Sequence, residues 1–236
     1  ALLLKDEIRN KWRDIPLIVC AEQDYLGTPE NYLNKTIIKP EDRVSLASLA
    51  GEYNLTLLYS RLYPKENIDL MNEMLPDMQK LLILMDKRYV NQQIQWEISE
   101  ILKKHYPRIE YKTIYAEETS INQLLDTLKL VDKATTGVLF SSWFHAQQFN
   151  RRTLLMINSF QIISNSSVPI FTLRNAFMKH GGMIGGYMYD DTDFENKLIK
   201  TISEVLTGTQ PKDIPFYYPV KAAPTFNYNT LLLKGI

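Results

Sequence analysis

Short apolar runs recur along the chain, and most of them are continuous rather than alternating with polar residues. Continuous apolar strands are typical of a parallel sheet whose two faces are both covered by helices. From residue 80 to residue 168 the runs begin about 30 residues apart, which is the length of a strand–helix–strand unit. The runs are IPLIVCA (15–21), LTLLYS (55–60), KLLILMD (80–86), YKTIYA (111–116), GVLFSS (137–142), VPIFTLR (168–174) and MIGGYMY (183–189).

Stretches with helical spacing of apolar residues separate these runs. Two of the predicted helices begin with a capping-box sequence, formed by Ser120 with Gln123 and by Thr192 with Glu195. Strands and helices together predict an α/β fold with a doubly wound parallel sheet. The stretches with helical spacing are 90–106, 120–132, 144–163 and 193–207.

The predicted elements divide the chain unevenly. Residues 80–208 predict a doubly wound lobe with a five-stranded parallel sheet, whereas residues 1–60 hold too few elements for a second such lobe. We therefore predict a partial lobe I made of 1–65 plus 209–236, and a lobe II that spans 66–208. A sheet of two or three strands would leave an apolar edge bare. Lobe I is therefore interpreted as truncated, and we expect self-association into a homodimer through that edge.

Composition narrows the class of protein. Lys+Arg and Asp+Glu both number 27, so the net charge is zero and no overall basic field favours nucleic acid. The single cysteine, Cys20, cannot form an intrachain disulfide and is expected to be buried within its apolar run. No apolar stretch reaches the ~18 residues that a membrane span requires. The opening ALLLKDEIRNKWRD has too short an apolar run for a signal peptide and is interpreted as part of an amphipathic helix.

Candidate ligand-binding residues follow from the predicted sheet, because ligands of open α/β sheets bind beyond the carboxyl ends of the strands. Aromatic faces with charged and amide groups at these ends suit a small polar or aromatic ligand. We expect Trp143 and Tyr25 either to sandwich a sugar or heterocycle or to pack against helix ends. Asp86 with Arg88 is expected either to bind ligand, to form a local ion pair or to cap a helix. The predicted ligand-binding residues are Asp86, Lys87, Arg88, Tyr115, Ser141, Ser142, Trp143, Arg174, Asn175, Gln23, Asp24 and Tyr25.

Other motifs point to no further chemistry. The stretch GGMIGG (181–186) lacks the G-x-G-x-x-G spacing of a phosphate-binding turn, so its glycines are expected to permit close approach of neighbouring backbone. His180-Gly-Gly has no accompanying G-x-S-x-G elbow, which argues against a hydrolase. The histidines are scattered, without a second ligand at metal-binding spacing. We predict no cofactor, no metal site and no catalytic residue.

Several longer stretches resemble one family. The chain is similar to the ABC-transporter substrate-binding proteins of the type I periplasmic-binding-protein fold, and more narrowly to the version that serves as extracytoplasmic sensor in bacterial hybrid two-component histidine kinases. The resemblance covers nearly the whole chain, although the family has a fuller lobe I. The stretches that carry it are RDIPLIVCAEQDY, LLYSRLYPKENIDLMNEMLPDMQKLLILMDK, HGGMIGGYMYDDTDFENKLIKTISEVLTGTQPKDIPF and FNYNTLLLKGI.

The resemblance implies a function of binding rather than catalysis. It implies two lobes joined by hinge strands near 60–66 and 208–212, and a ligand-dependent lobe closure that a kinase elsewhere in a membrane-anchored, periplasmic parent protein would read. The expected ligand is a sugar, a nucleoside or an amino-acid-like compound. A stand-alone ABC-transporter substrate-binding protein is the first alternative, and a two-lobed nucleotide-sugar enzyme is the second.

Overall fold

The chain folds into two compact units. The computed structural model describes residues 14–50, 52–144, 162, 165–175, 178, 182–219 and 221–234. Lobe I comprises Ala1–Leu62 and Tyr189–Ala222, and lobe II comprises Tyr63–Met188 and Ala223–Ile236. The helix expected over 144–163 and the amphipathic start of the chain fall almost wholly outside the described residues. Among the described helices, none combines the length and apolarity that crossing a membrane takes.

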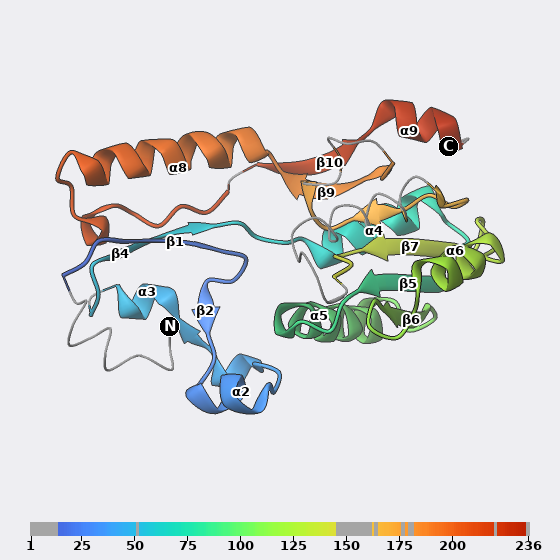
Figure 1. The fold of residues 1–236 in the computed structure, drawn as a ribbon, viewed down its shortest axis with the longest axis horizontal. Coiled ribbons are helices and arrows are strands. Elements are labelled where there is room, and N and C mark those ends of the chain that lie inside the picture. The colour runs from blue at the N-terminus through green and yellow to red at the C-terminus, as the bar shows by residue number, and fades with distance from the viewer. Residues whose placement is uncertain are drawn as a thin grey trace. The chain divides into compact units, whose positions relative to one another are not determined.

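Lobe II is built on a six-stranded sheet in the order β10-β9-β8-β7-β5-β6 (Figure 1). β5 pairs in parallel with both β6 and β7, β7 pairs in parallel with β8, and β8 with β9. The predicted doubly wound parallel sheet is thereby confirmed. The strands are β5 Lys80–Met85, β6 Glu110–Tyr115, β7 Thr136–Phe140, β8 Phe171–Thr172, β9 Gly185–Tyr189 and β10 Ala222–Phe226.

Helices cover this sheet and bury its apolar strands. α6 (Ile121–Lys129) places Leu124 and Leu128 in a core that also contains Val138 and Phe140 of β7. α5 (Tyr89–His105) buries Ile94 and Ile98 at the helical spacing that the sequence predicts. α9 (Tyr228–Lys234) is the last described helix of the lobe. Continuous burial along β7 explains why its sequence does not alternate with polar residues.

Asn67 ties α4 (Pro64–Met74) to the sheet. Its side chain is 0% exposed; Nδ2–H donates to the Tyr187 carbonyl and Oδ1 accepts the Tyr187 N–H, both at 2.8 Å. The amide therefore pairs with the main chain of β9, as a neighbouring strand would, and satisfies backbone groups that would otherwise be buried without partners. Asn67 thus links α4 directly to β9.

Lobe I contains a small parallel sheet of β1 (Leu17–Ala21) and β4 (Leu55–Tyr59). β4 is buried along most of its length, whereas β1 is only partly covered. Cys20 is exposed as a result, and the expectation that it is buried is wrong. The other elements of lobe I are β2 Tyr25–Leu26, α2 Pro29–Asn34, η2 Pro40–Asp42, β3 Val44–Ser45, α3 Leu46–Leu49, α8 Asp191–Leu206 and η4 Pro211–Asp213.

The division into lobes differs from the predicted one on the C-terminal side. The helix predicted over 193–207 in lobe II is α8 of lobe I, and residues 223–236, predicted in lobe I, belong to lobe II. Residues 223–236 belong to lobe II because β10 hydrogen-bonds to β9 and adds a sixth strand to the five that were predicted. Pairing between strands is a long-range contact, and no local pattern specifies which sheet a C-terminal strand joins.

Helix starts follow local side-chain chemistry. Ser120 and Gln123 form the predicted capping box of α6, with Ser120 N–H donating to Gln123 Oε1 at 2.9 Å and Gln123 N–H to Ser120 Oγ at 3.3 Å. At α8 the N-cap is Asp190, whose carboxylate accepts the Thr192 N–H at 2.8 Å. The predicted box of Thr192 with Glu195 is therefore wrong, because the preceding aspartate occupies the cap position first.

Two glycines of β9 are required by the strands on either side. A Cβ on Gly185 would lie 2.3 Å from the Thr225 carbonyl oxygen of β10, and one on Gly186 would lie 2.2 Å from that of Thr172 in β8. Both oxygens belong to backbone, which cannot move without displacing a strand. The close backbone approach predicted for the GGMIGG glycines is confirmed at these two positions.

We expect Gly186→Ala to lower the free energy of unfolding of lobe II by about 3 kcal/mol, because the new Cβ overlaps a strand carbonyl. Gly137→Ala is the matched control, since its Cβ would meet the flexible ends of Met71 and Met78, at 2.5 and 2.7 Å. That control should cost less than about 1.5 kcal/mol. Urea unfolding measures both, and equal losses would contradict the strand-contact explanation.

Candidate functional site

The candidate site lies in lobe II where the strand order reverses. β5 has β6 on one side and β7 on the other; the chain passes from β5 to β6 in one direction, and from β7 to β8 in the opposite direction. In open α/β sheets a crevice forms beyond the carboxyl ends of such strands, and ligands bind there. Asp86 directly follows β5, and Ser141 and Ser142 directly follow β7.

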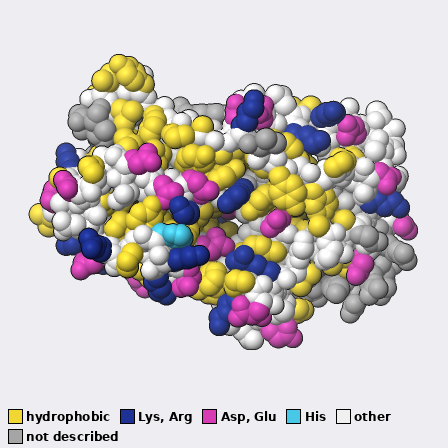
Figure 2. All heavy atoms as spheres, turned by 180° about the vertical axis from the view of Figure 1, so that it is seen from behind, with side chains coloured by type: hydrophobic (Ala, Val, Ile, Leu, Met, Phe, Trp, Pro, Cys, Tyr) yellow, Lys and Arg dark blue, Asp and Glu magenta, His cyan; other side chains and the backbone are white. Residues whose placement is uncertain are grey.

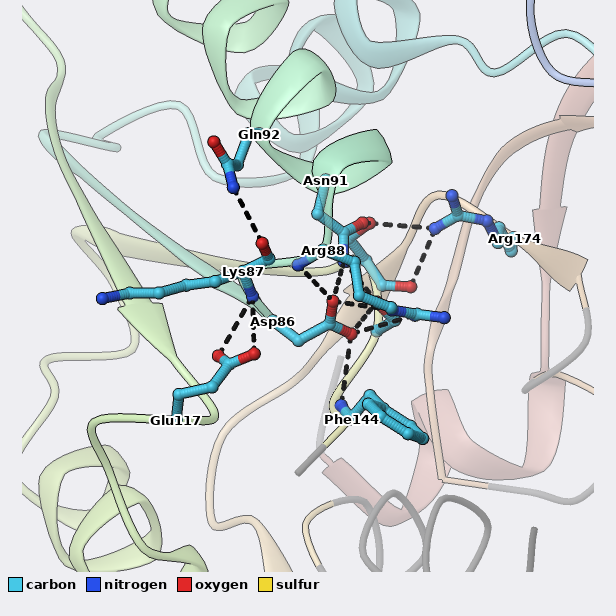
Figure 3. A network of polar contacts seen from close by, with 10 residues as sticks. Asp86, Lys87, Arg88, Asn91, Gln92, Glu117, Phe144 and Arg174 are labelled. Carbon is cyan, nitrogen blue, oxygen red and sulfur yellow. Dashed lines mark hydrogen bonds and ion pairs between the residues drawn. The ribbon is translucent and has the colours of Figure 1, made fainter. Parts of the chain in front are cut away.

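The Asp86 carboxylate is the centre of a hydrogen-bond network there (Figure 3), although it is 0% exposed. Its Oδ1 accepts Arg88 N–H at 3.1 Å, Arg88 Nε–H at 2.8 Å and Asn91 Nδ2–H at 2.7 Å. Its Oδ2 accepts Arg88 Nη2–H at 2.9 Å, Ser142 Oγ–H at 2.7 Å and Phe144 N–H at 3.2 Å. These donors use the acceptor positions of both oxygens, so the carboxylate holds its surroundings in place rather than offering itself to a ligand.

A directional chain of hydrogen bonds connects Arg174 to this carboxylate. Arg174 Nη1–H donates to the Ser141 carbonyl oxygen and to Ser141 Oγ, each at 2.9 Å. Ser141 Oγ–H donates to Asn91 Oδ1 at 3.0 Å, and Asn91 Nδ2–H donates to Ser142 Oγ at 2.8 Å. Arg88 Nη2–H also reaches Ser142 Oγ, at 3.1 Å. We call this set the relay: Asp86, Arg88, Asn91, Ser141, Ser142 and Arg174.

Local structure explains why these side chains converge. Arg88 is the N-cap residue of α5, and its carbonyl accepts the Asn91 N–H at 2.9 Å. Asn91 stands three residues before the buried Ile94, so it faces the sheet on the same side of the helix. Arg174 follows β8, where its N–H donates to Thr172 Oγ1 at 3.1 Å. Three neighbouring strands, β5, β7 and β8, thus each deliver part of the relay at their carboxyl ends.

Opposing effects set the pKa of Asp86. Burial of the carboxyl group by itself raises the pKa, but hydrogen bonds from Arg88 and Ser142, with the Arg88 charge, outweigh it and hold the pKa below its usual range. Asp86 is therefore ionised at neutral pH. The Arg88 side chain is 47% exposed although its carboxylate partner is 0% exposed, so the ion pair spans the boundary between the lobe interior and solvent.

Lys87 and Tyr115 lie beside the relay but outside it. The Lys87 side chain points away from the Asp86 carboxylate in Figure 3, and its Nζ forms an ion pair with Glu118. Its main-chain N–H donates to the two Glu117 carboxylate oxygens at 2.9 and 3.0 Å, and its Nζ lies 5.2 Å from the centre of the Tyr115 ring. These residues form an exposed charged cluster at the ends of β5 and β6.

A groove of about 510 Å³ lies at the opposite end of the same sheet. Lys80, Glu110 and Thr136, the first residues of three strands, contribute to it together with Leu130 after α6. Leu130 is 88% exposed, so the groove is open to solvent. Because the amino ends of parallel strands are not where such sheets bind ligands, the relay rather than this groove is the candidate site.

Charged side chains of both signs also lie outside the relay. On the face drawn in Figure 2, the described Lys and Arg side chains are interspersed with Asp and Glu. Within the described part of the chain, no group of three or more His, Cys, Asp or Glu residues is placed to hold a metal ion.

Comparison with known proteins bears on the fold. No protein-family model matches the chain, and no curated protein matches its sequence. An ABC domain in complex with L-Trp from Streptococcus pneumonia aligns with a TM-score of 0.59 and 16% identity, over 95% of this chain and 69% of that one. A conserved domain protein from Vibrio cholerae aligns with a TM-score of 0.57 and 11% identity, over 100% and 79%. A ligand-free, open substrate-binding protein with adhesive properties from Clostridium difficile aligns with a TM-score of 0.56 and 13% identity, over 96% and 69%.

The chain has a type I periplasmic-binding-protein-like fold. The sequence resemblance to substrate-binding proteins of this fold is thereby confirmed at the level of the fold. Identities between 11% and 16% show the fold alone, so the site has to be argued from this chain's own residues.

The relay brings together five of the predicted ligand-binding residues of this periplasmic-binding-protein-like chain: Asp86, Arg88, Ser141, Ser142 and Arg174. Asn175 follows directly and is half-buried, and its carbonyl accepts the Met178 N–H at 2.8 Å. Its contact with a ligand stays a prediction, as do those of Lys87 and Tyr115.

The predicted aromatic sandwich does not form around Trp143. Its side chain is 1% exposed and packs in the core of lobe II with Phe140 and Ile162, so it presents no face to a ligand. The predicted alternative is packing against helix ends, and the structure places the side chain in the core cluster of lobe II. Gln23, Asp24 and Tyr25 lie in lobe I, where the Tyr25 ring is 4.1 Å from the Arg43 guanidinium carbon. Their ligand contacts stay predictions.

Asn91 is the site residue that the sequence interpretation missed. It is 0% exposed and donates to two members of the relay while accepting from a third. The available signal was an asparagine on the apolar face of a predicted helix, three residues before Ile94. Buried amides need partners, so a polar residue at a core position of the first turn points to a network beneath it.

We expect Asp86→Asn to lower the free energy of unfolding by about 3 kcal/mol at pH 7, because charged hydrogen bonds to Arg88 and Ser142 are weakened. Since the folded pKa of Asp86 lies below the unfolded one, this stabilisation is complete above the unfolded pKa of about 3.9 and is lost as the pH falls through the folded pKa. The difference in the free energy of unfolding between the native protein and Asp86→Asn should therefore become smaller as the pH falls below about 3.9.

Urea unfolding between pH 3 and pH 7 measures that dependence. The matched control is Asp126→Asn, which removes an exposed pair with Lys129 whose side chains are 71% and 63% exposed. It should change stability by no more than about 0.5 kcal/mol. If the loss in the free energy of unfolding caused by Asp86→Asn stays constant down to pH 3, the pKa of Asp86 is not lowered in the folded protein and the prediction is wrong.

Proposed function

We infer that this chain is a ligand-binding domain on the extracytoplasmic side of a bacterial membrane, and that it senses a small molecule for a hybrid histidine kinase. The observation that carries the proposal is the relay, a hydrogen-bonded polar network at the carboxyl edge of lobe II whose members Asp86, Asn91, Ser141 and Ser142 are buried. Polar groups ordered in this way at a strand-order reversal suit recognition of a small ligand. The sensor role itself rests on the sequence resemblance to kinase-associated domains.

Ligand binding in this proposal uses the exposed parts of the relay. Arg88 and Arg174 stand at its two ends and provide directional donors, while the buried members keep them in place. The ligand is a sugar, a nucleoside or an amino-acid-like compound, and the last class is supported by a solved structure of the same fold that carries L-Trp. Occupancy would favour closure of the lobes, which a membrane-anchored parent protein would convert into kinase regulation.

Two alternatives remain distinct from the sensor. A stand-alone transporter component is favoured by the substrate-binding protein of the same fold from Clostridium difficile. A nucleotide-sugar enzyme has less support, because the relay contains no histidine or cysteine and its serine hydroxyls are engaged by Asp86 and Asn91. We therefore propose no enzymatic activity for this domain.

A thermal-shift screen against amino acids, sugars, nucleosides and small aromatic compounds tests the binding function. A compound present at about 100 times its dissociation constant should add roughly 2.7 kcal/mol of stability. Arg88→Ala and Arg174→Ala should abolish that shift, whereas Arg108→Ala, at an exposed position before β6, should retain it. A panel without a stabilising compound, or shifts that both arginine variants keep, would contradict the proposed site.

Experiments on the intact parent protein, on cells and on the purified domain distinguish the sensor role from its two alternatives. A stabilising compound should change the rate of autophosphorylation of the intact kinase reconstituted in vesicles. Dependence of cellular uptake on the chain would favour the transporter component instead, and turnover of sugar nucleotides by the purified domain would favour the enzyme.

A further inference from the structure

β6 forms one edge of the lobe II sheet, where β5 is its neighbour on one side and no described strand lies on the other. Glu110 N–H donates to the Gln79 carbonyl at 2.8 Å, so the even-numbered residues of β6 direct their main-chain groups toward β5. The main-chain groups of Tyr111 and Thr113 therefore point outward. Within the described part of the chain, these outward groups have no hydrogen-bond partner.

The first half of this edge is open to solvent. Glu110, Tyr111 and Lys112 are all exposed, with 38% of Tyr111 accessible, whereas Ile114 in the second half is only 7% exposed. An open strand edge with unpaired main-chain groups is a template on which another strand can pair. The accessible part of the template is thus the three-residue segment 110–112.

Two opposite charges flank Tyr111 on one face of the strand. Glu110 and Lys112 alternate with Tyr111, so they project to the same face as Ile114, which packs in the core with Leu124 of α6. Both charged residues line the groove of about 510 Å³ at the amino end of the sheet. Among the described residues neither has an ion-pair partner.

We propose that this edge of β6 is the surface through which two copies of the chain associate, by antiparallel pairing centred on Tyr111. In this register Tyr111 faces Tyr111 of the second copy and exchanges both main-chain hydrogen bonds with it. Glu110 of each copy lies opposite Lys112 of the other. This inference goes beyond the proposed function and does not depend on which ligand the domain binds.

Charge complementarity selects both the partner and the register. Opposite charges directly across an antiparallel pair are favourable and like charges are unfavourable. Pairing centred on Lys112 would place two lysines opposite each other, and pairing centred on Thr113 would use the covered half of the strand. Charged residues on an edge usually discourage pairing with other strands. A second β6 in the Tyr111 register is a partner whose charges neutralise them, and two-fold symmetry forms the ion pair twice.

Sedimentation equilibrium with the 236-residue chain tests the association. We expect a concentration-dependent species of twice the 27.5 kDa chain mass. Tyr111→Pro should abolish it, because proline lacks the outward N–H, while an outward edge position tolerates proline without loss of the β5 pairing. Tyr111→Val is the matched control, since it keeps the N–H, and should still associate.

Two outcomes of this experiment would overturn the proposal. One is a chain that stays monomeric up to about 1 mM, a concentration at which a dimer with a micromolar dissociation constant is populated. The other is a dimer that folded Tyr111→Pro retains, which would assign association to a different surface, such as the bare edge expected for lobe I. Circular dichroism shows whether Tyr111→Pro is folded. If it is not, the charge variants decide the question.

A charge exchange tests the register. Lys112→Glu sets two glutamates opposite each other and should weaken association at least about tenfold. Adding Glu110→Lys to the same chain reverses the order of charges and should restore association. Lys212→Glu, at an exposed position of lobe I, changes net charge equally and should have no effect. A double variant as weak as Lys112→Glu alone would contradict the opposition of residues 110 and 112.

Disulfide formation between two different variants provides a direct test. Cys20 is exposed, so all chains carry Cys20→Ser. A size-tagged chain with Glu110→Cys is mixed with an untagged chain with Lys112→Cys. Their Cα atoms would lie about 4.5 Å apart, within the range of a disulfide, and the second Glu110–Lys112 pair of the dimer is kept. We expect oxidation to link tagged to untagged chains. Linkage that is as efficient within either variant alone would overturn the register.

Discussion

The burial of one carboxylate constrains the whole candidate site. Asp86 is 0% exposed, and a charge removed from water in this way is tolerated only with several donors around it. Arg88, Asn91, Ser142 and the main chain at Phe144 supply them, so the ends of β5 and β7 and the start of α5 are fixed relative to each other. Arg174 extends the same network to the end of β8. The need of the buried Asp86 charge for hydrogen-bond donors thus fixes the ends of β5, β7 and β8 relative to each other.

The sheet supplies the platform that makes this network possible. β5 and β7 are mostly apolar and largely buried, and polar residues follow where each of these strands ends. Close strand spacing is maintained by glycines of β9 that admit neighbouring carbonyl oxygens, and Asn67 ties α4 to the same strand. The apolar core and the polar relay are therefore separated in space, since the relay lies at the carboxyl ends of the strands. The separation lets the ends of the strands differ between proteins that share the fold.

The structural neighbours show how little the fold alone says about the ligand. Proteins with 11% to 16% identity share the architecture, and identity at this level shows the fold alone. In this chain the Asp86 carboxylate is surrounded by donors of its own lobe: Arg88, Asn91, Ser142 and the Phe144 main chain.

The amino-acid sequence by itself determined the periodicities that make α5, α6 and the strands of lobe II, and it determined that Asp86, the two serines and Arg174 follow strand ends. These are local properties, set by side-chain spacing within one element. Only the tertiary structure decided that Trp143 lies inside the core, that Asn91 closes the relay, and that β10 joins the sheet of lobe II. Each of these depends on contacts between segments distant in sequence, whose geometry exists only once the strands have paired and the helices have packed on them.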